Sequence, residues 1–134
     1  MVATKVNKHT LSRQAWPQST YRVYCTINGV DMVSASGWHA AVKTPEYAYI
    51  NKTDERNRPD NRATVDFEFG EQVTITDQGD EFYTLSNGTR LQKAFADYYS
   101  SEYPEAKWYN AGGMQPIGIK QSNKLVAVIM PVRS

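Results

Sequence analysis

Alternating apolar and polar residues on both sides of a turn signal predict a β-hairpin near the start of the chain. Residues 21–35 alternate around Asn28-Gly29, a pair that tolerates the positive φ angles of a two-residue type I′ turn. The turn fixes the register, which places Cys25 opposite Met32 on an apolar face. We therefore expect Cys25 to be a small buried hydrophobe rather than a nucleophile.

Similar patterns predict further strands and one long exposed loop. The strands are expected at 46–51, 63–69, 71–77, 81–85, 116–120 and 124–131. The third and fourth of these pair as one hairpin, and the last two pair as another. In 63–69 the side chains of Val65, Phe67 and Phe69 are expected to face the core. Residues 125–130 are apolar at every position, which is typical of a central strand covered on both faces, whereas 53–62 predict a loop.

The best helical pattern covers residues 90–101. Its apolar side chains recur at i, i+3, i+4 and i+7, as Leu91, Ala94, Phe95 and Tyr98. Thr89 and Gln92 have the spacing of a capping box at the helix start, and Pro104 ends the helix. Residues 104–109 can add one further helical turn.

Residues 36–43 are ambiguous. One interpretation is a short helix capped by Ser36, with Trp38, Ala41 and Val42 facing inward and Pro45 ending it.

Together these elements predict an α+β fold. We expect a mainly antiparallel sheet of six to eight strands, with the principal helix, about 90–101, packed on one face. Residues 1–19 lack hydrophobic periodicity, and we interpret them as a flexible basic arm with Leu11 and Trp16 as anchors. Because ordering that arm costs more than burying two side chains gains, we expect mobility through about Arg13. Residues 20–134 form a single domain.

Composition narrows the class of protein. The chain has 134 residues, 40% of them apolar and 22% charged, which is the composition of an ordinary globular domain. No apolar run approaches the ~20 residues that span a bilayer, so no membrane contact is expected. A single cysteine excludes an internal disulfide and suits a reducing compartment. With a polar N-terminus that does not have the pattern of a secretory signal, this predicts a cytoplasmic protein.

The charges are unevenly distributed although the net charge is only +1. Residues 1–30 and 106–134 carry cations and no acid, whereas 46–81 are mainly acidic. This asymmetry favours a nucleic-acid-binding accessory protein as an alternative function. Its phosphate contacts would come from Lys5, Lys8, Arg13, Lys107, Lys120, Lys124 and Arg133. A mixed surface that only keeps the protein soluble explains the same pattern.

Few residues could carry catalysis. The chain has two histidines, His9 and His39, and none of the phosphate-loop, nucleophile-elbow or zinc-protease motifs. A small enzyme would have to use His39 or the pair Asp66/Glu68, where the plainer interpretation is a structural histidine and two solvated carboxylates. We expect no cofactor and no metal.

Aromatic residues are the compositional peculiarity. Nine tyrosines and three tryptophans are present, and several crowd into residues 98–109. Tyrosine and tryptophan provide large contact areas at low entropic cost, so they are enriched at binding surfaces. We therefore expect a non-catalytic, accessory or inhibitor-like protein-binding domain, of a kind common in phages and mobile elements. The contact residues are expected to be Tyr99, Tyr103, Trp108, Lys120, Met130 and Arg133. Some of the aromatic residues, such as Phe95 and Tyr98, have core spacing instead.

The C-terminal hairpin, residues 116–133, resembles the C-terminal end of the bacterial DNA polymerase sliding clamp. The resemblance rests on Pro116-Ile117-Gly118-Ile119 and on the strand ending Met130-Pro131-Val132-Arg133. Ser134 stands where the clamp has a final leucine, and the clamp is built from three-domain subunits. The resemblance implies a groove near Met130, Pro131 and Val132 that receives hydrophobic peptides.

Overall fold

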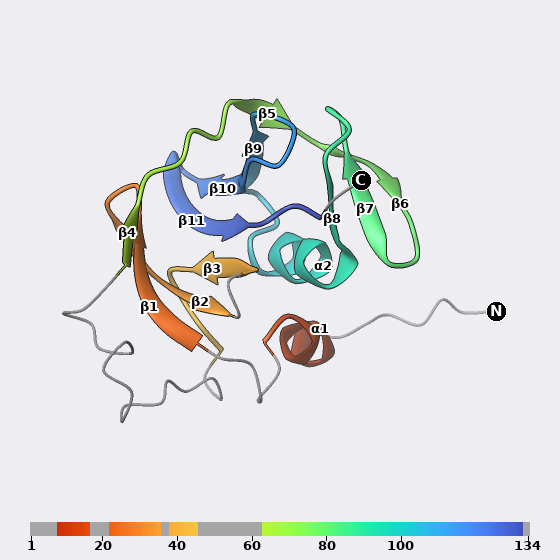
Figure 1. Cartoon of the computed structure of the whole chain (residues 1–134). Helices are drawn as coiled ribbons and strands as arrows, with labels where there is room; N and C mark the ends of the chain where they lie inside the picture. The colour runs from red at the N-terminus through yellow and green to blue at the C-terminus, as the bar shows by residue number, and fades with distance from the viewer. Residues whose placement is uncertain (1–7, 17–21, 36–37, 46–62, 133–134) are drawn as a thin grey trace.

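The computed structural model describes residues 8–16, 22–35, 38–45 and 63–132. Within these residues the fold is α+β, with two helices and eleven strands (Figure 1). The helices are α1 (Lys8–Ala15) and α2 (Lys93–Glu102). The principal helix and the mainly antiparallel sheet predicted from the sequence are therefore confirmed.

Eight strands form a large sheet. Their spatial order is β4 (Ala63–Val65), β1 (Arg22–Ile27), β2 (Val30–Ala35), β3 (His39–Ala41), β11 (Lys124–Ile129), β10 (Ile117–Gln121), β9 (Lys107–Asn110) and β5 (Glu71–Val73). Every neighbouring pair is antiparallel except β1 with β4, which run parallel. A second sheet has three strands, β6 (Ile75–Gln78), β7 (Phe82–Leu85) and β8 (Arg90–Gln92).

The large sheet has two different faces. One face packs against α1, α2 and the small sheet through a core that includes Trp16, Leu91, Tyr99 and Ile119. We call this the helix face. Ala41 of β3 belongs to this core. Because side chains alternate along a strand, its neighbour Ala40 lies on the opposite face. A smaller cluster on that face also contains Cys25, Ile27, Met32, Phe69, Leu125 and Val128. We call this the open face.

The two hairpins with the strongest turn signals have the predicted form. In the first, Cys25 pairs with Met32, and both turn residues have positive φ, at 50° for Asn28 and 77° for Gly29. In the last, β10 and β11 are joined through Ser122 and Asn123, with φ of 53° and 64°. Both turns therefore have the twist that matches the strands on either side.

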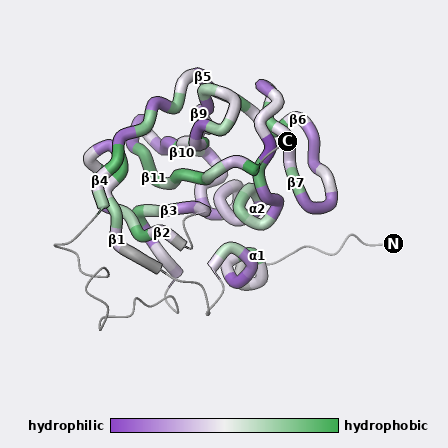
Figure 2. The backbone as a smooth tube through the Cα atoms, viewed as in Figure 1, coloured by the Kyte–Doolittle hydropathy of each residue, from purple (hydrophilic) through white to green (hydrophobic). Residues whose placement is uncertain are grey.

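The apolar strand near the C-terminus is central, as its pattern predicts. β11 lies between β3 and β10, and its buried residues belong to both cores, with Ala127 and Ile129 on the helix face and Val128 on the open face. Figure 2 shows this hydrophobic stretch inside the sheet, in contrast to the hydrophilic turn between β6 and β7.

The helix considered for residues 36–43 is wrong where the structure describes them. His39–Ala41 form β3, which pairs with β2 on one side and β11 on the other. Trp38 and Val42, expected to face inward, are 47% and 43% exposed. Pairing on both sides satisfies the backbone of this short alanine-rich segment, and such long-range pairing overrides local helix propensity.

The principal helix begins later than predicted. Residues 90–92 form β8, which pairs with β7, and α2 starts at Lys93 with no side-chain cap from Gln92. The hydroxyl of Thr89 donates to Asn110 instead of capping a helix. Phe95 and Tyr98 are buried as their spacing predicts, and Leu91 is buried from a strand rather than a helix.

Three strand predictions also change. Residues 71–77 divide at Thr74, because β5 joins β9 while β6 makes the expected hairpin with β7. Residues 104–109 include β9 rather than a helical turn. β4 ends at Val65, which is 38% exposed, and of the side chains expected inward only Phe69 is fully buried. The strand at 46–51 and the loop at 53–62 lie outside the described residues.

The described part of the N-terminal segment forms a helix that packs on the core. Residues 8–15 form α1, and Leu11, Ala15 and Trp16 are buried in the core shared with α2. Leu11 and Trp16 are thus in the core, as the predicted anchoring role requires, and the predicted mobility through about Arg13 stays a prediction. The backbone hydrogen bonds of the helix and the burial of these side chains together offset the conformational entropy that is lost when this segment is ordered. Residues 1–7 and 17–19 of the expected arm lie outside the described residues.

This packing predicts that trypsin cleaves slowly after Arg13. Cleavage requires α1 to unfold locally, so its rate follows the packing of that helix. Leu11→Ala removes a buried side chain, at a cost of about 2 kcal/mol or more, and is expected to accelerate cleavage at Arg13. Gln14→Ala, at an exposed position, serves as the control. Rapid cleavage after Arg13 in the unsubstituted chain would show that α1 does not stay packed in solution.

A close contact between Gly118 and Phe69 gives a second prediction. A Cβ built on Gly118 would lie 2.6 Å from Cγ of Phe69, so only glycine lets this ring lie flat on β10. Gly118→Ala is expected to lower the free energy of unfolding by about 1–3 kcal/mol through overpacking. In a Phe69→Ala background the same substitution should cost almost nothing. Urea denaturation of the four proteins measures the coupling, and additive costs would contradict the contact.

Candidate functional site

The residues expected to bind a protein partner do not share one surface. Tyr99 is fully buried, at 0% exposed, and Trp108 is 8% exposed. Tyr103 is half-buried, with its ring stacked on Tyr99 at 6.4 Å between centroids. The structure thus assigns Tyr99 and Trp108 to the core, so neither offers an exposed side chain to a partner.

The remaining expected contact residues lie on different parts of the fold. Lys120 is on β10, with its Nζ 5.0 Å from the centre of the Tyr109 ring. Met130 follows β11 and is half-buried on the open face. Arg133 lies outside the described residues.

His39 is the centre of a buried polar cluster. The side chain is 2% exposed and lies on β3, between the two helices and the sheet. Its Nδ1 is 2.6 Å from the Tyr99 hydroxyl, and its Nε2 is 2.8 Å from the carbonyl oxygen of Ala15. The ring also packs against Phe95 and, edge to face, against Trp16. One histidine therefore connects β3 to both helices.

These contacts fix the protonation of the ring. A carbonyl oxygen can only accept, so Nε2 carries the hydrogen that is donated to Ala15. Because the pKa of His39 is about 4, the imidazole is neutral at neutral pH, and Nδ1 accepts from the Tyr99 hydroxyl. Burial lowers the pKa of His39 from 6.5 to about 4, against a smaller raising effect of the Ala15 bond. Burial also raises the pKa of Tyr99, which keeps its hydroxyl protonated. Both ring nitrogens are engaged, so His39 acts as a structural histidine here.

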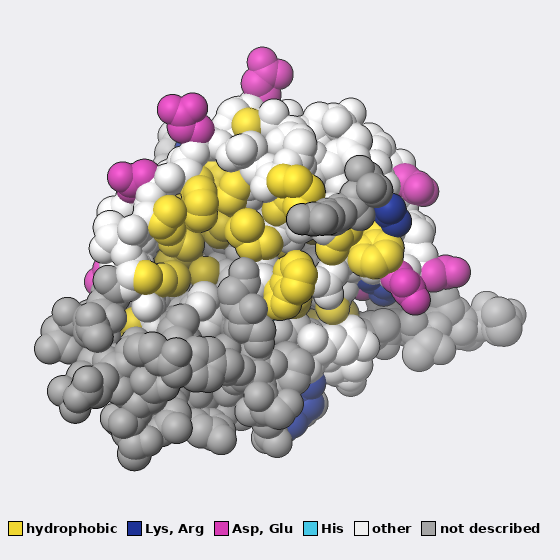
Figure 3. Space-filling view, viewed as in Figure 1, with side chains coloured by type: hydrophobic (Ala, Val, Ile, Leu, Met, Phe, Trp, Pro, Cys, Tyr) yellow, Lys and Arg dark blue, Asp and Glu magenta, His cyan; other side chains and the backbone are white. Residues whose placement is uncertain are grey.

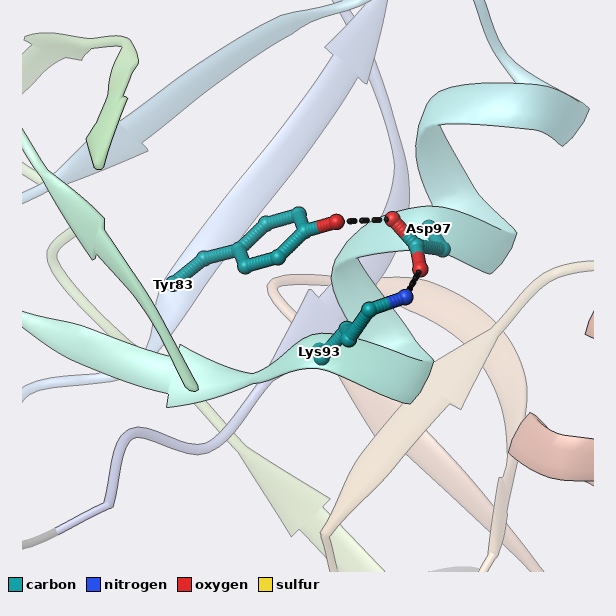
Figure 4. Close-up of polar contacts among 3 residues, drawn as sticks. All are labelled: Tyr83, Lys93 and Asp97. Atoms are coloured by element: carbon teal, nitrogen blue, oxygen red, sulfur yellow. Dashed lines mark hydrogen bonds and ion pairs between the residues drawn. The ribbon is translucent and has the colours of Figure 1, made fainter. Parts of the chain in front are cut away.

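A second polar group joins α2 to the small sheet (Figure 4). The Tyr83 hydroxyl donates to one oxygen of Asp97 at 2.7 Å, and the Lys93 ammonium binds the other oxygen. Burial, with the hydrogen bond to Asp97, raises the pKa of Tyr83, and the Asp97 contact raises that of Lys93. A general base or nucleophile would need the opposite shifts. This group therefore braces β7 against the helix.

A third polar group holds two loops together around Asn110, which is 2% exposed. Its Oδ1 accepts from the side chains of Asn87 and Thr89 and from the backbone of Gly112, each at 2.8 Å. Its Nδ2 donates to the carbonyl oxygens of Gln115 and Pro116. Both the oxygen and the nitrogen of this amide are therefore occupied by hydrogen bonds within the protein, and the side chain holds the two loops in place.

The open face carries an apolar pocket with a volume of about 150 Å³. Its lining comes from β1, β2, β3, β4, β11 and the segment after β4: Cys25, Ile27, Ser34, His39, Ala40, Ala63, Val65, Phe67, Val128 and Met130. No acid, lysine or arginine is among them. Figure 3 shows hydrophobic side chains gathered in the middle of this view, over β11 and the segment from β4 to β5. Apolar side chains make up most of this lining.

Two hydrogen bonds fix the far wall of this pocket. The Asn28 amide donates to the carbonyl oxygen of Phe67 at 2.9 Å and accepts from its backbone N–H at 2.7 Å. The turn that sets the first hairpin thus also positions the segment after β4. Phe67 contacts Phe69 edge to face, which orders this wall further.

Of the side chains that line this pocket, Met130 is the one that the sequence analysis assigned to a binding surface. Trp38 is 47% exposed beside the pocket, and its carbonyl oxygen accepts from the Met130 N–H at 2.8 Å. Val65 lines the pocket and is 38% exposed. The signal for Val65 was present in the alternation of 63–69, but alternation does not reveal whether a second layer covers that face.

The pair of carboxylates considered above for catalysis lies on the surface of the protein. Asp66 and Glu68 are both exposed after β4. Among the residues that the structure describes, no group of three or more histidine, cysteine or acidic side chains could hold a metal ion. In the same residues, no helix is both long and apolar enough to cross a membrane.

Comparison with known proteins adds no relative. No family model matches the chain, and no curated protein or solved structure matches it significantly.

The pKa of His39 predicts how stability depends on pH. Between pH 6.5 and about 4 the unfolded chain binds a proton at His39 and the folded chain does not. Stability therefore rises with pH across this window, and His39 accounts for about 3 kcal/mol of the change. His39→Gln is expected to be less stable at pH 7, with a deficit that shrinks as the pH falls toward 4.

Urea denaturation at several pH values measures this effect, with His39→Gln compared directly with the unsubstituted chain. Carboxylates that titrate in the same range contribute to both proteins and cancel in the difference. A stability difference that does not change between pH 7 and pH 4 would contradict the neutral, buried state of the ring.

Proposed function

We propose that this chain is a non-catalytic binding domain whose partner is a protein. The observation that carries the proposal is the apolar pocket on the open face, bordered by Trp38 and Met130. The helix face is already covered by α1, α2 and the small sheet. The open face is the one with exposed apolar side chains beside a cavity, which is typical of an interaction site.

The pocket suits one apolar side chain of the partner. A cavity of ~150 Å³ with an apolar lining can hold a group as large as benzene. Interfaces commonly depend on one such anchor in a pocket, with tryptophan, tyrosine or arginine around it. Trp38 is exposed and its backbone is bonded to that of Met130, so we propose it as the aromatic residue of that surrounding contact. We propose an extended partner segment that inserts a leucine- or phenylalanine-sized side chain between Val65 and Met130.

The clamp-like hairpin supports the same position. The resemblance implies a peptide groove near Met130, Pro131 and Val132, and the pocket contains Met130. Pro131 is buried, and Val132, which bridges to Arg90, lines a different crevice, so Met130 is the one of the three residues that lines this pocket. We further propose that the protein acts in the cytoplasm as an accessory or inhibitor-like protein.

Peptide selection tests this function. Random peptides displayed on phage and selected on the full chain should converge on a motif with one large apolar residue. Val65→Lys places a charge in the pocket at a partly exposed position and should weaken the selected peptides at least tenfold in fluorescence anisotropy. Val42→Lys, exposed but outside the pocket lining, is the matched control.

Two outcomes would overturn the proposal. One is that no apolar motif is selected. The other is that the selected peptides bind equally well to the chain and to its Val65→Lys variant. Circular dichroism of both lysine variants shows whether either substitution has disturbed the fold.

A further inference from the structure

The outer edge of β5 is an edge of the large sheet that no described strand covers. β5 is the last strand in the spatial order and pairs with β9 on its inner side (Figure 1). Thr74, which follows β5, directs both of its backbone groups to the outer side. Its carbonyl oxygen accepts from the Ser86 N–H at 2.8 Å, and its N–H donates to the Ser86 hydroxyl at 3.2 Å. Because backbone groups alternate between the two edges of a strand, the N–H and the carbonyl oxygen of Gln72 also point outward.

The neighbouring segment leaves these two groups of Gln72 without a partner. The chain turns away after Ser86, where the N–H of Gly88 donates to the carbonyl oxygen of Leu85 and the chain returns as β8. Within the described residues, no backbone hydrogen bond reaches Gln72 on its outer side. A donor and an acceptor that point outward from one residue are a template for a further strand.

A polar crevice of about 520 Å³ opens at this edge. It is lined by Gly70, Glu71, Gln72, Val73, Ser86, Asn87, Asn110 and Ala111. Its walls are held in place, because Asn87 donates to Asn110 at 2.8 Å and a Cβ built on Gly70 would lie only 2.7 Å from Cα of Ala111. A crevice that is formed before a ligand arrives lowers the entropic cost of binding.

Glu71 gives the crevice its charge. It is the one charged residue of the lining, it is exposed, and among the described residues no lysine or arginine forms an ion pair with it. Glu71 lies directly opposite Asn110 across β5 and β9, so both side chains project from the same face of the sheet. A cationic side chain that enters the crevice on this face can pair with the carboxylate.

We propose that the outer edge of β5 binds an extended basic peptide segment of a partner protein as an additional strand. One residue of the segment exchanges two main-chain hydrogen bonds with Gln72. The residues on either side of it then face Glu71, where a lysine or arginine pairs with the carboxylate. In this mode main-chain bonds supply affinity, and alternate side chains supply specificity.

The short length of the free edge favours a peptide segment over a second copy of the sheet. Ser86 already uses the outward groups of Thr74, so Gln72 is the residue of β5 that offers both a donor and an acceptor. The edge is also separate from the apolar pocket, because β5 and β4 lie at opposite ends of the large sheet.

The charge of the segment is tested with a fluorescein-labelled hexapeptide of alternating valine and lysine, titrated with the full chain in fluorescence anisotropy. With a valine opposite Gln72, every lysine faces the side of Glu71. Glu71→Gln should weaken binding about two- to fivefold, as for one exposed ion pair, and by less at high salt. A hexapeptide of alternating valine and glutamate should bind at least fivefold more weakly than the lysine peptide.

Two substitutions at one position separate backbone contact from side-chain contact. Gln72→Pro removes the outward N–H, which an edge strand tolerates, and should weaken binding about tenfold. Gln72→Ala keeps this N–H and should leave the affinity nearly unchanged. Circular dichroism shows whether the proline variant keeps its fold. Methylated peptides give the same test on the unsubstituted chain, since N-methylation of the valines should abolish binding and N-methylation of the lysines should not.

Several results would overturn the assignment. These are no binding of the valine–lysine peptide at ~1 mM, equal binding of the valine–glutamate peptide, or equal binding of the two methylated peptides. An equal loss in Gln72→Ala and Gln72→Pro would also contradict main-chain pairing. Val65→Lys should leave this affinity nearly unchanged, and a loss as large as that of Gln72→Pro would place the peptide in the apolar pocket instead. Failure of the valine–lysine peptide to bind would leave the apolar pocket and its selected peptides unaffected.

Discussion

The neutral ring of His39 holds the fold together at the point where its layers meet. It lies on a strand in the interior of the large sheet, accepts from a tyrosine of α2 and donates to the last carbonyl of α1. A buried imidazole is tolerated only when both nitrogens are satisfied. The position of each helix therefore depends on the other, because both use the same ring. Trp16 and Phe95 pack around it and exclude water from these bonds.

The same arrangement explains why the two faces of the sheet differ. Both helices and the small sheet lie on the side where His39 meets Tyr99, and they cover that side fully. The other side is covered in part by the segment that carries Phe67 and Phe69, which the Asn28 turn holds in place. The apolar pocket therefore lies on the side of the sheet that the helices do not cover. Both ring nitrogens of His39 are used in these structural hydrogen bonds.

Local patterns in the sequence predicted the elements that depend on local chemistry. The Asn28-Gly29 turn and its register, the central apolar strand and the existence of α2 follow from turn preference and periodicity. The errors arise where pairing with other strands, rather than local preference, decides whether a segment becomes a strand or a helix. Residues 39–41 became a strand because β2 and β11 flank them, and 90–92 because β7 does. The site was harder still, because tyrosines at helical spacing look alike whether buried or exposed, and the pattern around Trp38 indicated a helix with that side chain facing inward.

The position of β11 in the sheet has a consequence for synthesis of the chain on the ribosome. β4, β1, β2 and β3 form one half of the large sheet and β10, β9 and β5 the other, and β11 is the strand that joins them. It is also the last of the described strands to be made. Until it emerges, the nascent chain has two unpaired inner edges, at β3 and β10, each able to pair with a wrong partner. The chain therefore depends on late closure, and a chaperone that shields those edges would act before β11 inserts.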